Sequence, residues 1–371
     1  METQAAVLSH TAHPRPYTGS RPLRLETVQL DEPGPGELLV AIDAAGVCHS
    51  DLSVVDGTRR RPTPMALGHE ATGTVKAVGD FVTDVAEGAR VVLIFVPSCG
   101  LCGQCTGGRP AQCRNGARAN AEGSLLSGAR RLQHAGVSLH HHLGVSGFAR
   151  HAVVDRRSAV VIDDDVPAPI AAMFGCAVLT GVGAVINTAD VRPGESTVVI
   201  GLGGVGLAAV LGARLAHAHP IIALDPVPAK RDLALELGAT IALDPADTAA
   251  LADLLPTGAE VTIEAAGRIP ALELAWSLTR PGGRTVSVGL PDPSQRLALP
   301  VTDLIGQGRT LLGSYLGDAV PQRDIPRYLA LWRAGKLPVE LLLTGTRPLA
   351  EINEALEDLA SGQVVRQVLL P

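Results

Sequence analysis

The chain has 371 residues, of which 46% are hydrophobic and 18% charged, and its formal net charge is -6. This length predicts two domains, and the composition predicts well-packed globular domains rather than a disordered or fibrous chain. The acidic balance and an aromatic content of only 2% argue against nucleic-acid binding. Proteins that bind nucleic acids usually carry a basic surface and aromatic side chains on which bases stack.

The first ten residues, METQAAVLSH, lack the basic and apolar regions of a signal peptide. Two uncharged stretches, residues 168–189 and 196–213, are interrupted by glycines, which favours buried turns over a membrane span. We therefore expect a cytoplasmic protein with no membrane partner. In such a reducing compartment, six cysteines favour metal binding over disulfides.

The expected elements change character along the chain. In the first half, short β-branched or alternating runs predict strands at residues 38–48, 71–79 and 89–96. From about residue 178, strands alternate with helices, which predicts parallel βαβ units. The strands are expected at 196–201, 221–225, 260–267 and 284–289, and the helices at 204–216, 229–239 and 270–280. The C-terminal segment adds a helix at 349–362 and a strand at 365–370.

A glycine-rich loop stands between the first predicted strand and helix of this second half. Its segment GLGGVG comprises Gly201, Leu202, Gly203, Gly204, Val205 and Gly206. The first glycine of such a loop allows a tight turn, the next lets a pyrophosphate approach, and the last packs helix against strand. The free N–H groups of the helix N-terminus would then face the phosphates. The loop predicts a dinucleotide site, and a glycine-rich turn without a ligand is the alternative.

Asp225 ends the next predicted strand, roughly twenty residues after the loop, where dinucleotide-binding folds carry an acid for the ribose. Its carboxylate would accept the ribose hydroxyls of NAD and repel the 2′-phosphate of NADP. We therefore expect NAD. Lys230 and Arg231 follow on the next helix, where either could reach the ribose, and they keep NADP open as the alternative.

The stretch PSCGLCGQCTGGRPAQC holds Cys99, Cys102, Cys105 and Cys113. This spacing suits four thiolates around a tetrahedral zinc. A closed shell of this kind leaves no position for a substrate, so the metal is expected to be structural. Disulfides and an iron–sulfur cluster stay open as alternatives.

The remaining thiols, Cys48 and Cys176, and the imidazole of His69 in the segment GHE come from dispersed positions. Two thiolates and one imidazole would leave the fourth position of a zinc open for water or alcohol. Taken singly, each residue is a weak signal. A buried cysteine is more often a small core residue, and a histidine beside an acid such as Glu70 is more often structural.

Five motifs occur together in chain order, namely GVCHSD, GHEATGTVKAVG, the four-cysteine loop, GCAVLTGVGA and GLGGVG. With them the sequence resembles the zinc-dependent alcohol dehydrogenases of the medium-chain dehydrogenase/reductase superfamily. The resemblance runs essentially from end to end, with little insertion or deletion against the long-chain and glutathione-dependent formaldehyde dehydrogenase classes.

The resemblance implies an α/β fold with a β-rich part. We expect a GroES-like catalytic domain over residues 1–177, a Rossmann domain with a doubly wound parallel sheet over 178–316, and a return to the catalytic domain over 317–371. It also implies two zinc ions per chain, one catalytic and one structural, together with NAD. Family members associate through the Rossmann domain, so a homodimer or homotetramer is expected.

The resemblance also assigns roles to single residues. The catalytic zinc would lie on Cys48, His69 and Cys176, with Glu70 beside it as a further candidate ligand. Asp51 would orient the His69 ring, and Ser50 would take the proton of the alcohol. The implied cofactor contacts, besides the glycine loop and Asp225, are His49, Thr180, Lys230, Arg268 and Arg366. Zinc would lower the pKa of the alcohol oxygen, and hydride would pass to NAD.

One position departs from the family pattern. The proton relay of the family often ends in a histidine five residues after the first zinc ligand, and here that place holds Ser53. A serine is not a base near neutral pH. We therefore expect the proton to leave through water, through His49 or by another route.

The motif alignment also predicts the substrate pocket, which would be lined by Phe95, His142, Leu143, Leu290 and Tyr315. Apolar walls beside a zinc suit a primary alcohol or aldehyde, including aromatic ones. His142 ends a run of three histidines, residues 140–142, for which a partly exposed turn is the alternative.

Three functions follow from these patterns. The leading prediction is an NAD- and zinc-dependent dehydrogenase of small-molecule alcohols and aldehydes. The first alternative is a thiol-adduct-dependent formaldehyde dehydrogenase, although Gly57, Arg59 and Ala117 stand where the glutathione-using class carries acids and an arginine. The run Arg59–Arg61 is either a solvated surface or an attractor of acidic substrates. The remote alternative is a non-catalytic structural or binding protein on the same scaffold.

Overall fold

The computed structural model describes residues 1–362 and 364–371, which form two compact units. Unit 1 comprises Met1–Cys176, Val320–Pro326 and Leu343–Pro371, and unit 2 comprises Ala177–Ala319 and Arg327–Leu342. The first boundary lies next to the one expected after residue 177. We expected residues 317–371 to return to the catalytic domain as one continuous segment. The structure instead interrupts this segment, because residues 327–342 belong to unit 2.

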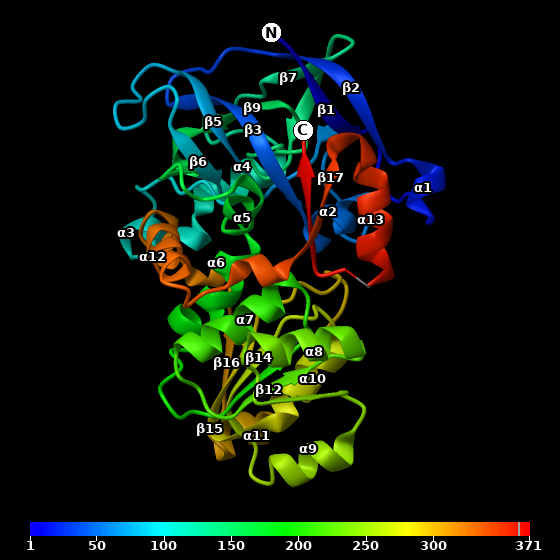
Figure 1. The fold of residues 1–371 in the computed structure, drawn as a ribbon, viewed down its shortest axis with the longest axis vertical. Helices are drawn as coiled ribbons and strands as arrows, with labels where there is room; N and C mark the ends of the chain where they lie inside the picture. The colour runs from blue at the N-terminus through cyan, green and yellow to red at the C-terminus, as the bar shows by residue number, and fades with distance from the viewer. Residues whose placement is uncertain (363) are drawn as a thin grey trace. The chain divides into compact units, whose positions relative to one another are not determined.

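Unit 1 is built on two β-structures, drawn mostly in blue and green in Figure 1. Its closed barrel contains, in spatial order, β1 (Glu2–Leu8), β2 (Leu23–Leu30), β7 (Leu132–His134), β8 (Val137–His141) and β4 (Met65–Ala66). Its open sheet has the order β10 (Ala159–Ile162), β6 (Arg90–Leu93), β5 (Ala71–Val78), β3 (Glu37–Val47), β18 (Arg366–Leu370) and β17 (Leu343–Pro348). A further strand, β9 (His151–Asp155), pairs with β3.

β3 is the central strand of this sheet, and its sequence explains why. Val40, Ile42 and Ala44 are buried at every second position, while the residues between them are only partly buried. This period of two is that of a strand with one face on the core. β18 pairs with the end of β3 in antiparallel fashion, with Gln367 opposite Val47. The last strand of the chain therefore lies beside the residue that precedes Cys48.

The helices of unit 1 are short. They are α1 (Tyr17–Ser20), α2 (His49–Val55), α3 (Gly103–Thr106), α4 (Arg114–Glu122), α5 (Ala168–Met173) and α13 (Ile352–Ser361). α13 buries Ile352, Ala355 and Leu356, whose spacing defines one face of a helix. These side chains join the core that also contains residues of β1, β3 and β5.

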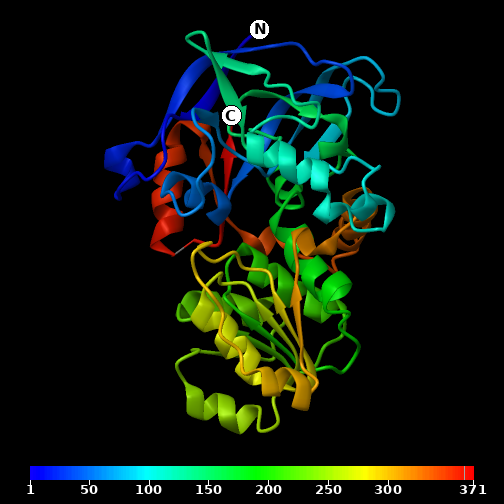
Figure 2. The ribbon, with the colours of Figure 1, turned by 180° about the vertical axis from the view of Figure 1, so that it is seen from behind.

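Unit 2 contains one six-stranded parallel sheet (Figures 1 and 2). The strands are β11 (Thr197–Ile200), β12 (Ile221–Leu224), β13 (Ile241–Leu243), β14 (Ala259–Glu264), β15 (Thr279–Ser287) and β16 (Thr310–Gly313), and their spatial order is β13-β12-β11-β14-β15-β16. The helices are α6 (Ala177–Gly183), α7 (Gly204–Leu215), α8 (Pro228–Leu237), α9 (Thr248–Leu254), α10 (Ile269–Leu278) and α11 (Val301–Gly306). α12 (Pro321–Arg333) begins in unit 1 and ends in unit 2.

The order of these strands reverses between β11 and β14. Because crossovers between parallel strands are right-handed, α7 and α8 cover one face of the sheet and α10 covers the other. β11 is buried along its whole length, as expected for a parallel strand covered on both faces. The unit is therefore a doubly wound sheet, and its switch point lies between the carboxyl ends of β11 and β14.

The predicted strands and helices are confirmed at both ends of the chain. β3, β5 and β6 overlap the three runs expected in the first half, and the alternating elements from β11 to β15 overlap those expected in the second. α13 and β18 match the predicted C-terminal helix and strand. The fold class, a β-rich GroES-like part with a Rossmann-type parallel sheet, is therefore confirmed.

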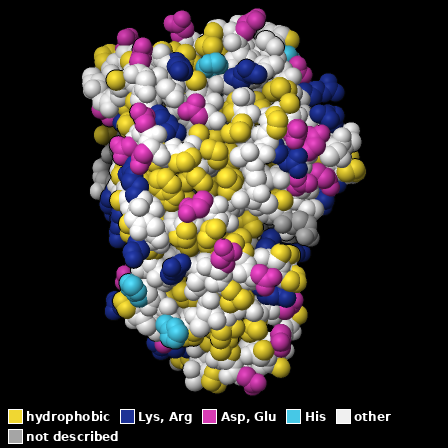
Figure 3. All heavy atoms as spheres, viewed as in Figure 1, with side chains coloured by type: hydrophobic (Ala, Val, Ile, Leu, Met, Phe, Trp, Pro, Cys, Tyr) yellow, Lys and Arg dark blue, Asp and Glu magenta, His cyan; other side chains and the backbone are white. Residues whose placement is uncertain are grey.

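Helix length and surface charge can be described directly. Among the described residues, no helix is both long and apolar enough to cross a membrane. On the face drawn in Figure 3, Lys and Arg side chains are interspersed with Asp and Glu.

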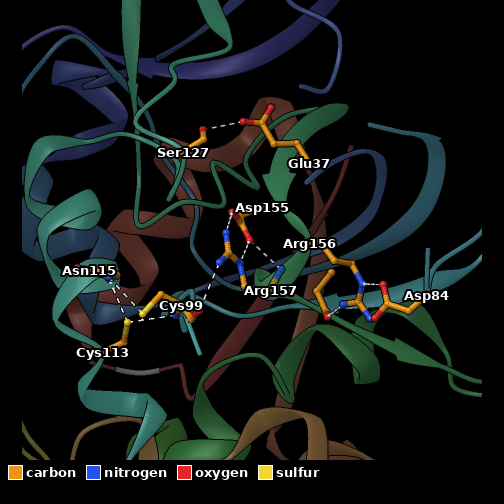
Figure 4. Close-up of polar contacts among 11 residues, drawn as sticks. Glu37, Asp84, Cys99, Cys113, Asn115, Ser127, Asp155, Arg156 and Arg157 are labelled. Carbon is orange, nitrogen blue, oxygen red and sulfur yellow. Dashed lines mark hydrogen bonds and ion pairs between the residues drawn. The ribbon is translucent and has the colours of Figure 1, made fainter. Parts of the chain in front are cut away.

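A buried carboxylate fixes the start of β3. Glu37 is fully buried and accepts hydrogen bonds from Gly34 N at 2.9 Å, Ser127 Oγ at 2.8 Å and Arg131 Nε at 2.8 Å. Figure 4 shows the contact with Ser127. Since Ser127 and Arg131 precede β7, this carboxylate ties the strand of the open sheet to the segment that enters the barrel.

We expect Glu37→Ala to lower the stability of unit 1 by about 3 kcal/mol, the lower end of the range for removing one partner of a buried ion pair. The lower end applies because 24% of the Arg131 side chain stays in contact with water. Calorimetric unfolding measures this as a lower midpoint temperature. Glu32→Ala removes an exposed acid of the same segment and is the matched control. An equal loss in both variants contradicts the assignment.

Candidate metal centres and nucleotide site

Three donors from separate parts of unit 1 meet in one place. Cys48 lies between β3 and α2, His69 lies just before β5, and Cys176 follows α5. All three are buried, and their donor atoms lie within 4.8 Å of one another. We call these three residues the dispersed donor cluster.

The chemistry of the dispersed donor cluster fits a zinc ion. Nε2 of His69 is buried and has no hydrogen-bond partner in the described part of the chain. A hydrogen bond from Cys176, with the charges of Arg366 and His69, lowers the pKa of the Cys48 thiol well below its usual value despite burial. Two thiols and one imidazole nitrogen supply three corners of a tetrahedron, which leaves one corner for a substrate. The cluster therefore fits a catalytic zinc.

Asp51 contacts two residues of the dispersed donor cluster. Its Oδ2 accepts a hydrogen bond from Cys48 N at 3.0 Å, and its Oδ1 lies 2.9 Å from His69 Nδ1. Asp51 is the third residue of α2, so the first of these bonds caps the helix. Burial acts to raise the pKa of Asp51, but the neighbouring imidazoles of His69 and His142 lower it. One ionised carboxylate thus holds the backbone of one donor and the ring of another.

Glu70 lies outside the dispersed donor cluster, so the structure does not bring it in as the fourth ligand that the sequence suggested. Its Oε2 lies 3.4 Å from Arg366 Nη1, and Arg366 also donates to Val47 O at 3.1 Å. Burial, partly opposed by the charge of Arg366, raises the pKa of Glu70 to about 7. The carboxylate of Glu70 lies outside the cluster because the buried guanidinium of Arg366 attracts it.

Sequence patterns missed the residue that makes room for this pair. Gly46 lies directly under Glu70, and an added Cβ there would collide with the Glu70 carboxylate. Gly46 N also donates to Glu70 O at 2.8 Å. A glycine inside a predicted strand is the only sequence signal of such a close approach.

The four-cysteine loop has the dimensions of a zinc site. The Sγ atom of Cys102 lies 3.6 Å from that of Cys105 and 3.9 Å from that of Cys113. Four sulfurs at about 2.3 Å from a tetrahedral zinc are about 3.8 Å apart. All four cysteines are free of disulfides, which excludes the alternative in this structure. The closed thiol set fits a structural zinc.

Hydrogen bonds and an ion pair hold this loop in place (Figure 4). Asn115 Nδ2 donates to Cys99 Sγ at 3.3 Å, and Cys99 N donates to Cys113 Sγ at 3.2 Å. The guanidinium of Arg157 makes two hydrogen bonds of 2.8 Å with Asp155 and reaches Cys99 O at 3.5 Å. The loop is therefore connected to the end of β9, where Asp155 lies.

The glycine loop of unit 2 lies at the switch point of the sheet. Gly201 has a φ of +89°, and a Cβ there would lie 2.7 Å from Ala266 N in the segment after β14. At Gly206 a Cβ would collide with the carbonyl of Gly201, whereas at Gly203 it would meet no atom within 4 Å. The loop thus needs glycine for its own turn and leaves open space at Gly203, where a pyrophosphate can approach α7.

Asp225 lies at the carboxyl end of β12, beside this loop. Its Oδ2 accepts from Leu202 N at 2.8 Å and its Oδ1 accepts from Val227 N at 2.9 Å. Arg231 Nη1 donates to Asp225 O at 2.7 Å and lies 3.4 Å from Asp244 Oδ2. The acid is held in the loop by the backbone, and the guanidinium next to it is already engaged. This arrangement fits NAD.

The predicted proton-transfer residues lie on the first turns of α2. His49 is exposed, Ser50 is half-buried, and Ser53 Oγ donates to His49 O at 2.8 Å. This bond within the helix turns the Ser53 hydroxyl toward the backbone. It agrees with the view that Ser53 does not replace the missing relay histidine.

The other predicted cofactor contacts divide between the units. In unit 2, Thr180 is buried in α6 with an unpaired Oγ1 among the described residues, Lys230 is half-buried in α8, and Arg268 is exposed at the start of α10. In unit 1, Arg366 is 3% exposed and faces Glu70. The roles of these four residues toward a cofactor stay predictions.

The structure brings two of the five predicted pocket residues to the dispersed donor cluster. The rings of Phe95 and His142 both stand edge-on to His69, with centroid distances of 5.5 Å and 5.4 Å. Leu143 is buried beside His142. Leu290 and Tyr315 belong to unit 2, where both are exposed.

The alternative that the three histidines form a partly exposed turn is wrong for His141 and His142. His141 ends β8 and His142 follows it, and both are buried. His141 Nε2 accepts from Arg131 N at 3.1 Å, and burial lowers the pKa of His141 to about 3. His142 Nδ1 lies 3.3 Å from Asp51 Oδ1, so this ring contacts the carboxylate that orients His69.

The neighbouring arginines are also tied to the fold. Arg61 Nη1 donates to Asn120 O at 2.8 Å, and Arg59 N donates to Ser53 O at 2.7 Å. Arg60 is exposed. The run is thus partly anchored to α2 and α4.

Comparisons with known proteins agree with this geometry. The family model "Alcohol dehydrogenase GroES-like domain" matches residues 34–164, and "Zinc-binding dehydrogenase" matches residues 204–333. A geraniol dehydrogenase from Castellaniella defragrans is 40% identical over 375 aligned positions, which cover 100% of this chain and 99% of the relative.

Two solved structures share the whole fold. A zinc-binding-domain alcohol dehydrogenase protein from Burkholderia ambifaria has a TM-score of 0.93 at 35% identity, and benzyl alcohol dehydrogenase from Acinetobacter calcoaceticus has a TM-score of 0.92 at 31% identity. Each match covers 100% of this chain and 99% of the solved chain. The chain therefore belongs to the zinc-binding alcohol dehydrogenases of the medium-chain dehydrogenase/reductase superfamily.

Proposed function

We propose that the protein is an NAD-dependent dehydrogenase that uses zinc to interconvert primary allylic or aromatic alcohols and their aldehydes. The observation that carries the proposal is the dispersed donor cluster, three buried donors whose His69 Nε2 has no hydrogen-bond partner among the described residues. When bound, zinc supplies Lewis acidity toward the alcohol oxygen, and NAD supplies the hydride acceptor. The identity of the enzyme class, an oxidoreductase acting on alcohols, rests on the full-length relatives.

Residues of unit 1 support the choice of substrate. Phe95 is a buried apolar side chain that stands edge-on to His69, and Leu143 is buried next to His142 in the sequence. Such walls suit the flat, apolar body of an unsaturated alcohol. The relatives include a geraniol dehydrogenase and a benzyl alcohol dehydrogenase, which act on alcohols of this kind by name.

Residues of unit 2 support the choice of NAD. The Asp225 carboxylate is fixed by two backbone N–H groups beside the glycine loop, and a 2′-phosphate there would meet its negative charge. Arg231 is held by Asp225 O and Asp244 and is thus less available to bind such a phosphate. We also retain the cytoplasm as the proposed compartment, because six free cysteines are typical of a reducing environment.

The proposal predicts NADH formation from geraniol and benzyl alcohol by the zinc-loaded protein, with a higher kcat/KM for NAD than for NADP. The measurement is the absorbance of the reduced nicotinamide across short-chain, allylic, benzylic and acidic alcohols, each with and without added thiol. Formaldehyde with an added thiol is the control reaction. Turnover only in the presence of thiol would instead identify the thiol-adduct-dependent formaldehyde dehydrogenase. No turnover under any of these conditions would favour the non-catalytic binding protein.

Ser50 is proposed to take the proton of the alcohol, since it is half-buried two residues from Cys48. We expect Ser50→Ala to lower kcat for alcohol oxidation by about 10²–10⁴-fold, the usual contribution of a positioned proton acceptor. Ser53→Ala is the matched control, because its hydroxyl donates to His49 O within the same helix. Steady-state kinetics at saturating NAD would separate the two, and near-wild-type turnover in Ser50→Ala rules out the relay role.

For the assembly, we propose that unit 2 forms a homodimer through β16, with a tetramer as a further association of dimers. β16 is the edge of the sheet, and the neighbouring α11 and β16 expose Val301, Leu304, Ile305 and Leu311. An edge strand with unpaired backbone groups and an apolar border is a template for pairing with a second copy.

We expect sedimentation equilibrium to show at least a dimer of the 38.2 kDa chain, and Leu311→Lys to shift it toward the monomer. A charge on an edge strand opposes pairing with another strand. Leu235→Lys is the matched control, since Leu235 is an exposed leucine on α8, which precedes β13 at the opposite edge of the sheet from β16. A wild-type monomer, or equal effects of both variants, contradicts the proposed interface.

A further inference from the structure

We propose that His142 is a positioning residue for the metal ligand His69, acting through the Asp51 carboxylate that both imidazoles share. This inference rests on the catalytic zinc of the proposed function, but it does not depend on the substrate or on NAD. The place of His142 in the wall of the substrate pocket stays a prediction beside it.

The shared carboxylate is the central observation. Asp51 Oδ1 lies 2.9 Å from Nδ1 of His69 and 3.3 Å from Nδ1 of His142. The two rings are 5.4 Å apart and nearly perpendicular, at 79°. None of the three side chains is more than 1% exposed. The carboxylate is therefore shielded from bulk solvent, and the second imidazole is the polar group that lies against the oxygen bonded to His69.

The contact of His142 with Asp51 is a close electrostatic one. Its Nδ1 lacks a well-directed hydrogen bond in the described part of the chain, although the charged oxygen is only 3.3 Å away. The bond of Asp51 to His69 is shorter and directed. The ligand imidazole thus has the stronger hold on Asp51 Oδ1, and His142 is a second, weaker contact of the same oxygen.

The position of His142 is itself fixed by the strand that leads to His69. β8 pairs with β4, and His141 is in register with Ala66. His142 N donates to Ser146 Oγ at 3.0 Å, and Ser146 Oγ donates to Ala66 O at 2.9 Å. Ala66 precedes His69 by three residues, so the two imidazoles are held by the same pair of strands.

This arrangement has a consequence for the metal. A ligand imidazole keeps its orientation only if its hydrogen-bond acceptor is itself held in place. Without His142, one side of a buried carboxylate would lose its polar neighbour, and Asp51 could rotate away from His69 to find another partner. The His69 ring would then lose its fixed direction, and the dispersed donor cluster would hold a metal less tightly.

The test uses the full-length protein with Co²⁺ bound at the dispersed donor cluster as a spectroscopic probe of zinc. We expect His142→Leu to raise the dissociation constant of Co²⁺ by about tenfold, the lower end of the range for partners of metal ligands. Its visible absorption bands should also shift, because the His69 ring changes direction. His142→Asn retains an N–H donor close to the place of Nδ1 and should restore most of the affinity and the spectrum.

Phe95→Leu is the matched control. Phe95 also stands edge-on to His69, at 5.5 Å, but its ring has no group that can donate to Asp51. This variant should change KM for alcohols and leave the dissociation constant of Co²⁺ unchanged. If His142→Leu behaves like Phe95→Leu, His142 is only a pocket wall and the inference is wrong.

A second variant guards against misfolding of His142→Leu. Ser146→Ala removes the hydroxyl that accepts from His142 N, and it should weaken Co²⁺ binding in the same direction by a smaller factor. An unchanged or tighter dissociation constant in Ser146→Ala and His142→Leu overturns the inference. A failure of the proposed function has a different signature, because metal affinity would still respond to His142 while no alcohol is oxidised.

Discussion

The carboxylate of Asp51 is the contact on which the metal centre of unit 1 depends. It accepts a hydrogen bond from the backbone of Cys48 and another from the ring of His69, and it lies beside His142. Burying an ionised group is costly unless its partners surround it. Here those partners are the donors that a metal needs, so the free energy that keeps Asp51 ionised also orders the site before any metal arrives.

A second buried pair separates two acids that stand close together in the sequence. Glu70 follows His69 directly, yet its carboxylate faces Arg366 from the last strand, with Gly46 making room for it. Asp51 faces the imidazoles, and Glu70 faces the guanidinium. The two negative charges therefore have different partners, and the donors of the dispersed cluster stay two thiols and one imidazole.

The sequence predicts a structural feature well when the residues that form it are close together in the chain. The glycine loop, Asp225 and the four-cysteine loop are short motifs whose spacing reflects their geometry, and their placement in the structure agrees with the predictions. Cys48, His69 and Cys176 are far apart in the chain, so only the resemblance to a family could group them. The alternation of strands and helices predicted the parallel sheet, because each element there is formed by a continuous run of residues.

The partners of His142 and Glu70 could not be predicted in this way. His142 reaches Asp51 because β8 pairs with β4, and a pairing between distant strands leaves no spacing signal in the sequence. Arg366 reaches Glu70 because β18 pairs with β3. The alternating pattern indicates that such strands exist but does not identify their neighbours.

The place of β18 has a consequence for how the protein matures during synthesis. The parallel sheet of unit 2 is complete once Gly313 has been made, whereas β3 acquires its last neighbour only from residues 366–370. Domains form as their chains emerge from the ribosome, beginning with those whose contacts are complete. The nucleotide fold can thus form on the ribosome, while the surroundings of Cys48 and Glu70 are completed only once residues 366–370 have been made. A chain cut before residue 366 would keep the strands of its dinucleotide fold and lack the strand that brings Arg366 to Glu70.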